Sequence, residues 1–163
     1  MIKSPLLVIV GPTSSGKSAF AIQMAQSLNG EIISADSRYL YHELEIGVAK
    51  PTASELEDAP HHLINVASLK DPWNLGLYKQ EATFVIEEIH KRHSLPILAG
   101  GTGQYVRAIL QNWQVPSHGP NNQLREDLET IGNLLGFDKL FEMLNAIDPQ
   151  AAASIDYRNH RRT

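Results

Sequence analysis

The sequence contains the pattern G-x-x-x-x-G-K-[ST] as Gly11-Pro-Thr-Ser-Ser-Gly-Lys-Ser18. Glycines let the backbone curl until successive N–H groups point at one spot, where they and a helix N-terminus bind phosphate oxygens. Lys17 adds a full positive charge, and the hydroxyl of Ser18 is suited to bind a magnesium ion. We therefore expect the chain to bind a di- or triphosphate together with Mg²⁺. The expected phosphate-binding residues are Gly11, Pro12, Thr13, Ser14, Ser15, Gly16, Lys17 and Ser18.

Two other segments whose residues could take part in a reaction also follow short apolar runs. Asp36-Ser37 comes after Glu31-Ile-Ile-Ser-Ala35, and Gly100-Gly-Thr-Gly103 comes after Leu95-Pro-Ile-Leu-Ala99. An aspartate is ionised at neutral pH without any special environment. Asp36 is therefore suited either to act as a general base or to bind magnesium, directly or through another magnesium ligand. The residues alone leave these two roles open.

The order of elements predicts how these segments are brought together. We expect strands at 6–10, 31–35 and 95–99, and helices at 19–28, 77–93 and 103–113, with 39–76 mostly loop plus one short helix. Strands that alternate with helices form a parallel sheet covered on both faces, with the ligand crevice beyond the carboxyl ends of the strands. The three polar segments should therefore converge on one site in an α/β core spanning residues 1–113.

Residues 114–163 are expected to form a separate helical unit. Residues 114–122 contain two prolines, a glycine and asparagines, and are typical of a linker. An apolar stripe predicts a helix at about 124–135, stopped by Gly136. We expect a second helix capped by Asp138, and a third that begins at Asp148-Pro149 with a cap and a proline in its first position.

Composition limits the class of protein. The chain has 163 residues, 42% of them hydrophobic, a net charge of −4 and no cysteine. Disulfides and thiolate zinc sites are excluded, and no global basic field would attract nucleic acid. The strongly apolar N-terminal run is five residues long, so we expect no secretory signal, no membrane span and a cytoplasmic monomer. Arg158, Arg161 and Arg162 form a local basic cluster, which is either a solvated tail or a phosphate contact.

Histidines and aromatic residues give less specific signals. His61 and His62 are adjacent, so in a strand they would point to opposite faces, and no third metal ligand is obvious. Trp73, Tyr105 and Trp113 are suited to stack on bases or to line an isoprenoid pocket, but core packing is the commoner role of such residues.

Several segments together with the phosphate loop give the chain a resemblance to the tRNA dimethylallyltransferases, whose fold is similar to that of P-loop kinases. The likeness runs from about residue 6 to the last residue. The segments are Asp36-Ser-Arg-Tyr-Leu-Tyr41, Glu45-Ile-Gly-Val-Ala-Lys-Pro51, Pro60-His-His-Leu-Ile64, Gly100-Gly-Thr-Gly-Gln-Tyr105 and Asp148-Pro-Gln-Ala-Ala-Ala-Ser-Ile155, followed by Asp156-Tyr-Arg-Asn-His-Arg-Arg162.

The resemblance implies transfer of a dimethylallyl group from dimethylallyl diphosphate to the N6 amine of the adenosine 3′ to a tRNA anticodon. The leaving group is then pyrophosphate, whose growing charge the phosphate loop, Lys17 and Mg²⁺ can stabilise. The adenine amine is a poor nucleophile because its lone pair is delocalised. Asp36, which matches the family's catalytic aspartate, would accept the amine proton during attack. The target base must leave its stack to reach that carboxylate.

Other roles are also implied by the resemblance. Thr102 matches a family threonine near the base and the diphosphate, and it is also a candidate helix N-cap. Arg125 matches an arginine that contacts tRNA, although by its sequence position it is simply an exposed helix residue. The residues expected to contact tRNA are Asp36, Ser37, Arg38, Tyr39, Thr102, Arg125, Arg161 and Arg162.

Some features depart from the family pattern. Tyr39 stands where many members have glutamine, Val48 where threonine is usual, and Gln104 where leucine or methionine is usual. Family members also continue beyond Thr163 with the rest of the helical insertion, further core strands and another catalytic arginine, so we expect this chain to be truncated. The alternative functions are a P-loop small-molecule kinase, which would bind ATP, and a non-catalytic module that binds tRNA or diphosphate.

Overall fold

The computed structural model describes residues 5–114 and 121–159. The chain divides into two compact units, Met1–Ser117 and His118–Thr163, and each is described by itself. No helix in the described ranges is both long enough and apolar enough to cross a membrane.

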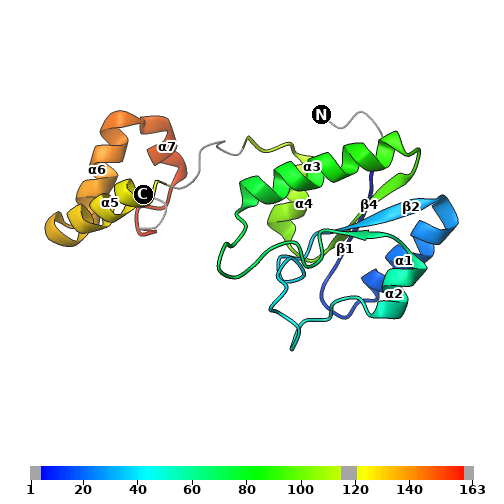
Figure 1. The fold of residues 1–163 in the computed structure, drawn as a ribbon. Coiled ribbons are helices and arrows are strands. Elements are labelled where there is room, and N and C mark those ends of the chain that lie inside the picture. Colours follow the sequence, from blue (N-terminus) through cyan, green and yellow to red (C-terminus); the bar gives the residue numbers. More distant parts are fainter. Residues whose placement is uncertain (1–4, 115–120, 160–163) are drawn as a thin grey trace. The chain divides into compact units, whose positions relative to one another are not determined.

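The first unit is built on a four-stranded parallel sheet (Figure 1). Its strand order is β1 (Leu7–Val10), β4 (Leu95–Gly100), β2 (Gly30–Ser34) and β3 (His61–His62). This arrangement confirms the predicted α/β class with a parallel sheet. The short β3 was missed, because it lies in the segment expected to contain only loop and one short helix.

Helices cover both faces of this sheet, as predicted (Figure 1). The helices are α1 (Lys17–Leu28), α2 (Ala53–Asp58), α3 (Leu75–Lys91) and α4 (Gly103–Leu110). Successive strand residues point to opposite faces. Ile32 and Ile97 therefore pack with α1, while Ile33 and Leu98 pack with α3 and α4. A strand that is buried on both faces consists of a continuous apolar run, which is why these strands are recognisable from the sequence.

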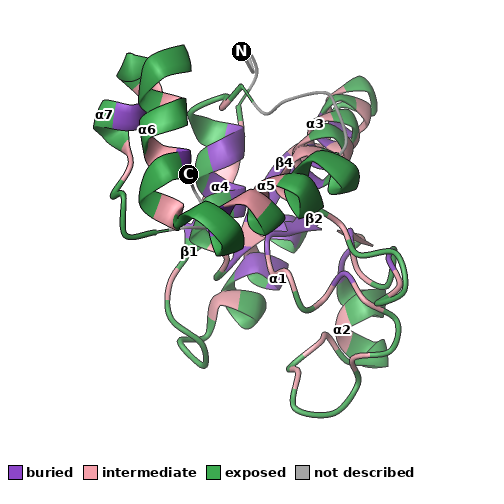
Figure 2. Cartoon of the chain, turned by 90° about the vertical axis from the view of Figure 1, so that its left-hand side faces the viewer, coloured by how far each residue is buried: buried purple, intermediate pink, exposed green. Residues whose placement is uncertain are grey.

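Within residues 121–159, the described part of the second unit, the helices are α5 (Asn122–Leu135), α6 (Phe137–Ile147) and α7 (Pro149–Ser154). Asp148 caps α7 by accepting a hydrogen bond from the Ala151 N–H, as expected. The expectation that Asp138 caps α6 was wrong, because Gly136 occupies the N-cap position and Asp138 lies in the first turn. These helices are mostly exposed in Figure 2, whereas the strands of the first unit are mostly buried.

Candidate active site

Three polar segments meet at the carboxyl edge of the sheet. The strand register places Val10 beside Gly100, and Ser34 beside Ala99. Beyond the strands, the Thr102 N–H donates to the Ala35 carbonyl over 3.0 Å. A Cβ built on Gly101 would lie 3.9 Å from the Gly11 carbonyl oxygen. The phosphate loop, the Asp36 turn and the glycine-rich segment are therefore neighbours, as the sequence predicted.

The phosphate loop has the backbone geometry that its motif requires. Ser14 and Gly16 lie in the left-handed region, with φ of 61° and 82°, and α1 begins at Lys17. No side chain caps this end of α1 in the part of the chain that the structure describes. The first N–H groups of the helix are thus available to an anion. The Lys17 ammonium donates to the Pro12 carbonyl over 2.5 Å, so its charge lies against the loop.

The residues at this end of α1 also fit a magnesium ion held mainly by phosphate oxygens. Mg²⁺ prefers oxygen ligands and is usually bound by one or two protein groups together with substrate phosphates. Ser18 is exposed in the first turn of α1, and its hydroxyl has no hydrogen-bond partner among the described residues. Within those residues no cluster of three His, Cys, Asp or Glu side chains could hold a metal by itself.

Asp36 is held in a tight turn directly after β2. Its N–H donates to the Ser34 hydroxyl over 3.3 Å, and its Oδ1 accepts the Arg38 N–H over 3.0 Å. The Oδ2 atom has no hydrogen-bond partner in the described part of the chain, and the residue is partly exposed. One carboxylate oxygen is therefore fixed by the backbone, while the other remains available to a substrate.

Thr102 connects two of the three segments. It occupies the N-cap position of α4, as expected, but its side chain makes no capping hydrogen bond. Instead Oγ1 accepts the Ser37 N–H over 3.0 Å and lies 3.4 Å from the Ser37 hydroxyl. The hydroxyl therefore ties the glycine-rich segment to the Asp36 turn.

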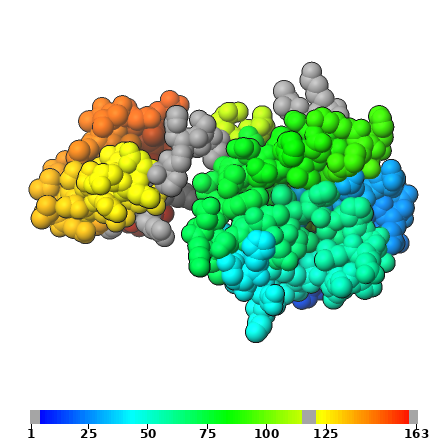
Figure 3. Space-filling model, viewed as in Figure 1, coloured from blue at the N-terminus to red at the C-terminus, as the bar shows by residue number. Residues whose placement is uncertain are grey.

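The loop after the Asp36 turn is pinned at its base. The Tyr39 hydroxyl donates to the Ala49 carbonyl, and the Lys50 ammonium donates to the Tyr41 carbonyl and to Asn65 Oδ1, both over 2.6 Å. Burial raises the pKa of Tyr39, and the nearby charges of Asp36 and then Glu55 raise it further, so the phenol stays protonated. The part of the loop at about residues 42–49 projects from the surface in Figure 3.

Two tyrosines lie in the core cluster that residues of β2, β4, α3 and α4 form. Tyr78 and Tyr105 stack with ring centroids 3.7 Å apart and an interplanar angle of 12°. The Tyr78 hydroxyl donates to the Ser34 carbonyl over 3.0 Å, two residues before Asp36. Tyr78 and Lys50 were not predicted to support the site, because both act through backbone groups that no sequence pattern reveals.

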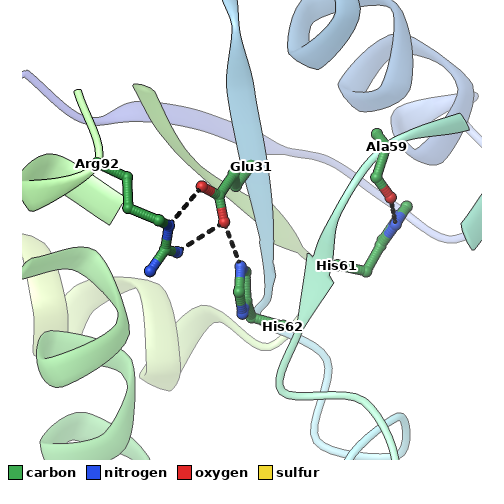
Figure 4. Close-up of polar contacts among 5 residues, drawn as sticks. All are labelled: Glu31, Ala59, His61, His62 and Arg92. Atoms are coloured by element: carbon green, nitrogen blue, oxygen red, sulfur yellow. Dashed lines mark hydrogen bonds and ion pairs between the residues drawn. The ribbon is translucent and has the colours of Figure 1, made fainter. Parts of the chain in front are cut away.

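A separate polar network lies near the amino end of β2, away from the candidate site (Figure 4). Arg92 makes two hydrogen bonds to the Glu31 carboxylate, of 3.0 and 2.8 Å, and His62 lies 2.7 Å from the same group. His61 Nδ1 instead lies 2.8 Å from the Ala59 carbonyl oxygen. The two histidines thus have different partners, in keeping with the opposite faces expected of adjacent strand residues.

Of the remaining predicted tRNA contacts, Arg38 belongs to the Asp36 turn, Arg125 belongs to the second unit, and Arg161 and Arg162 are not described. Arg38 is exposed beside Asp36. Arg125 is exposed on α5, in the second unit, and its side chain has no partner among the described residues. Arg161 and Arg162 lie outside the described residues, so their predicted role stays a prediction.

Comparison with known proteins identifies the family. The family model for IPP transferase matches residues 39–163. The chain belongs to the IPP transferase family. It is 46% identical over 160 residues to the tRNA dimethylallyltransferase of Thermomicrobium roseum, an alignment that covers 98% of this chain and 49% of that protein.

Solved structures of related enzymes agree with this assignment. The full-length tRNA isopentenylpyrophosphate transferase of Bacillus halodurans is 41% identical, with a TM-score of 0.68 over 98% of this chain and 53% of that one. A eukaryotic dimethylallyltransferase, described as acting on tRNA, is 31% identical, with a TM-score of 0.82 over 96% of this chain and 39% of that one. The chain therefore spans about half the length of these relatives, or less.

Proposed function

We propose that this member of the IPP transferase family transfers a dimethylallyl group from dimethylallyl diphosphate to the N6 amine of the adenosine 3′ to a tRNA anticodon. The proposal rests on the observation that two groups lie at the same edge of the sheet. A phosphate loop with an uncapped helix N-terminus lies there beside a carboxylate that keeps one oxygen available. The names of the relatives support the coarser part of the proposal, dimethylallyl transfer to tRNA.

In the proposed reaction the adenine N6 attacks the allylic carbon as the bond from that carbon to the diphosphate oxygen breaks. The pyrophosphate leaves with the bonding electron pair, and the N6 proton passes to Asp36. The N–H groups at the start of α1 and the Lys17 ammonium stabilise the charge that grows on the leaving group. Mg²⁺, held by the Ser18 hydroxyl and phosphate oxygens, would neutralise part of that charge.

The carboxylate is suited to serve as the base because it is already oriented. The Arg38 N–H fixes Oδ1, and the Thr102 hydroxyl fixes the next residue, Ser37. A preorganised acceptor needs little reorganisation when the amine proton is released. The same turn presents Ser37, Arg38 and Tyr39 beside Asp36, and we propose that these residues and Thr102 contact the tRNA around the flipped base.

The second unit would supply additional contacts to tRNA. Arg125 is an exposed cation on α5, and Arg161 and Arg162 follow in the same unit of the sequence. Arginine side chains bind phosphates through two parallel hydrogen bonds, which suits them to position a stem-loop rather than to read its sequence. The net charge of −4 makes such local contacts necessary, because no overall positive field would attract RNA.

A single-turnover assay tests the proposal. The chain is mixed in excess with radiolabelled dimethylallyl diphosphate, Mg²⁺ and an unmodified tRNA that carries adenosine after its anticodon. We expect label in the tRNA with the wild type, and at least about a 100-fold slower transfer with Asp36→Asn, because the amide cannot take the proton. Asp58→Asn, at an exposed acid on α2, is the matched control and should react normally.

Two results of this assay would contradict parts of the proposal. Absence of label with the wild-type chain would contradict transfer by this chain and would favour a binding role. Full transfer by Asp36→Asn would instead contradict the assignment of the base while leaving the reaction intact.

A further inference from the structure

Lys50 is a half-buried cation that pairs with no carboxylate within residues 5–114 and 121–159. Its ammonium donates to the Tyr41 carbonyl and to Asn65 Oδ1, both over 2.6 Å, and both acceptors are neutral. Lys91 and Lys139, by contrast, each pair with a glutamate on the same helix. An ammonium group has three N–H donors. One donor of Lys50 and its full charge therefore remain available to a ligand.

Two short routes connect Lys50 to the Asp36 turn. In the first, the Asn65 side chain accepts from Lys50, while the Asn65 N–H donates to the Tyr39 carbonyl over 2.9 Å. In the second, the Tyr39 hydroxyl donates to the carbonyl of Ala49, the residue before Lys50. The Tyr39 N–H in turn donates to the Asp36 carbonyl over 3.1 Å. Both routes thus end at Tyr39, the residue that closes the turn.

The topology places this cation on the same side of the sheet as the phosphate loop. Lys50 lies in the connection between β2 and α2, which is cyan in Figure 1 and leaves β2 at its carboxyl end. Ligands of parallel sheets bind beyond the carboxyl ends of the strands. The two hydrogen bonds of the ammonium hold the side chain before any ligand binds, so little conformational entropy is lost on binding.

The chemistry of such a group fits a phosphate of the substrate RNA. A strand that delivers a flipped adenosine to Asp36 must run past the segments beside the Asp36 turn, and each of its nucleotides carries a phosphate. Lysine binds phosphate as a point charge. We propose that Lys50 binds a backbone phosphate next to the target adenosine. The inference rests on the proposed function, because that function makes tRNA the substrate.

The salt dependence of RNA binding tests this contact, because each phosphate that a protein neutralises releases counterions. Fluorescence anisotropy follows the whole chain binding to the unmodified tRNA that carries adenosine after its anticodon, between about 50 and 200 mM KCl. Lys50→Met should bind about tenfold more weakly, the effect of losing one hydrogen bond to a charged group. The slope of log K against log salt should become shallower by about 0.7, the value for one phosphate of a single strand.

Asn65→Asp separates the charge of Lys50 from its structural role. The substitution keeps the shape of the side chain and replaces a neutral acceptor of Lys50 with a carboxylate. The hydrogen bond to Lys50 is retained, so the melting temperature should not fall. The ammonium charge is neutralised, so RNA binding should weaken and the salt slope should become shallower, as in Lys50→Met. A merely structural role of Lys50 predicts unchanged RNA binding in Asn65→Asp and a lower melting temperature in Lys50→Met with an unchanged slope.

Lys91→Met is the control for net charge, because it removes the same single positive charge. Lys91 ends α3, four residues before β4 begins at Leu95, and so lies at the amino edge of the sheet. Its substitution should change the affinity for tRNA by less than about twofold and leave the salt slope unchanged. Equal effects in Lys91→Met and Lys50→Met would overturn the inference, since net charge alone would then explain them.

A titration with pyrophosphate and Mg²⁺ distinguishes the RNA backbone from the diphosphate substrate as the source of the phosphate. The dissociation constant for pyrophosphate should be the same in the wild type and in Lys50→Met. Weaker pyrophosphate binding with an unchanged RNA salt slope would overturn the inference, as would the absence of RNA binding by the wild type. The radiolabel assay is read independently. Transfer with a normal salt slope in Lys50→Met would leave the reaction standing and reject the contact, whereas the expected slopes without transfer would retain the contact and reject catalysis by this chain.

Discussion

The Thr102 hydroxyl is the one side-chain group that joins the glycine-rich segment to the Asp36 turn among the described residues. Thr102→Val keeps the shape of the side chain but leaves the partly buried Ser37 N–H without its acceptor. We expect a loss of about 1–2 kcal/mol in unfolding free energy, together with slower transfer, because the turn that orients Asp36 is loosened. Urea unfolding and the single-turnover rate measure the two effects.

Thr102→Ser is the control for that substitution, because it keeps the hydroxyl and removes only a methyl group. Its transfer rate should stay close to that of the wild type. A Thr102→Val variant that transfers at the wild-type rate would show that the hydrogen bond to Ser37 does not position the carboxylate.

At the residue scale, sequence patterns selected candidate site residues but did not predict the interactions that those residues make. The G-x-x-x-x-G-K-[ST] spacing located Lys17 and Ser18 because the motif itself requires that backbone geometry. Thr102 was expected to cap α4, yet its hydroxyl bonds to a residue 65 positions earlier in the chain. A contact between segments so far apart depends on the register of β2 and β4, which local patterns do not specify.

At the scale of elements, the close approach of β4 to the chain after β2 explains one of the glycines. A Cβ at Gly100 would lie 2.3 Å from the backbone carbon and oxygen of Ala35. Gly100→Ala should therefore destabilise the chain by about 3 kcal/mol and displace the Asp36 turn, because backbone atoms cannot rotate away as a side chain can. We expect a lower melting temperature in thermal unfolding and a slower transfer rate.

Gly101→Ala is the neighbouring control, because its Cβ would have no contact closer than 3.9 Å, to the Gly11 carbonyl. We expect a stability change below about 0.5 kcal/mol, as for ordinary surface substitutions. Equal losses in the two variants would mean that the glycine-rich segment is constrained by something other than this approach.

The network around Glu31 ties β2 to the short β3 and to the end of α3 (Figure 4). Hydrogen bonds from Arg92 hold the pKa of Glu31 below its usual range, against the opposing effect of burial, and His62 contributes further. A lowered folded-state pKa stabilises the protein fully above the usual glutamate value, about 4.3, and this stabilisation is lost as the pH falls through the lower value. Glu31→Gln should therefore be less stable than the wild type at pH 7, with a difference that shrinks below about pH 4.3.

Urea unfolding between pH 7 and pH 3 measures that difference. The control is Glu142→Gln, which breaks an exposed pair with Lys139 on one helix and should change little, because exposed pairs contribute little to stability. A stability gap between Glu31→Gln and the wild type that stays constant down to pH 3 would contradict the role of the Glu31 charge.

The elements themselves were predicted to different degrees. Leu95–Gly100 and Leu75–Lys91 follow clear apolar patterns and lie where they were expected, to within a few residues. His61–His62 is too short and too polar to signal a strand, and it pairs with β2 because the Glu31 network and the Ile32 N–H, which donates to the Pro60 carbonyl, hold it there. Such pairing is a property of the tertiary structure, so local sequence patterns predicted only a loop there.

At the scale of the whole molecule, the two compact units differ in how much core each contains. Both hydrophobic clusters consist of residues from the first unit. In the described part of the second unit the buried residues are Gly132, Leu140 and Ala152, while apolar side chains such as Leu134 and Ile147 are exposed. A short unit with so little buried surface has little stability of its own.

We therefore expect a chain of residues 1–117 to fold alone and a peptide of residues 118–163 to be only partly helical. Circular dichroism should show a cooperative thermal transition for the first and a broad, shallow one for the second.

The first unit contains the whole phosphate loop, so pyrophosphate with Mg²⁺ should raise the melting temperature of the 1–117 chain. Ligand at 100 times its dissociation constant adds about 2.7 kcal/mol of stability. Lys17→Met should abolish that rise without lowering the melting temperature of the unliganded chain. A fragment 1–117 that does not unfold cooperatively would mean that the second unit is needed to complete the core, and a rise that persists in Lys17→Met would locate anion binding away from the loop.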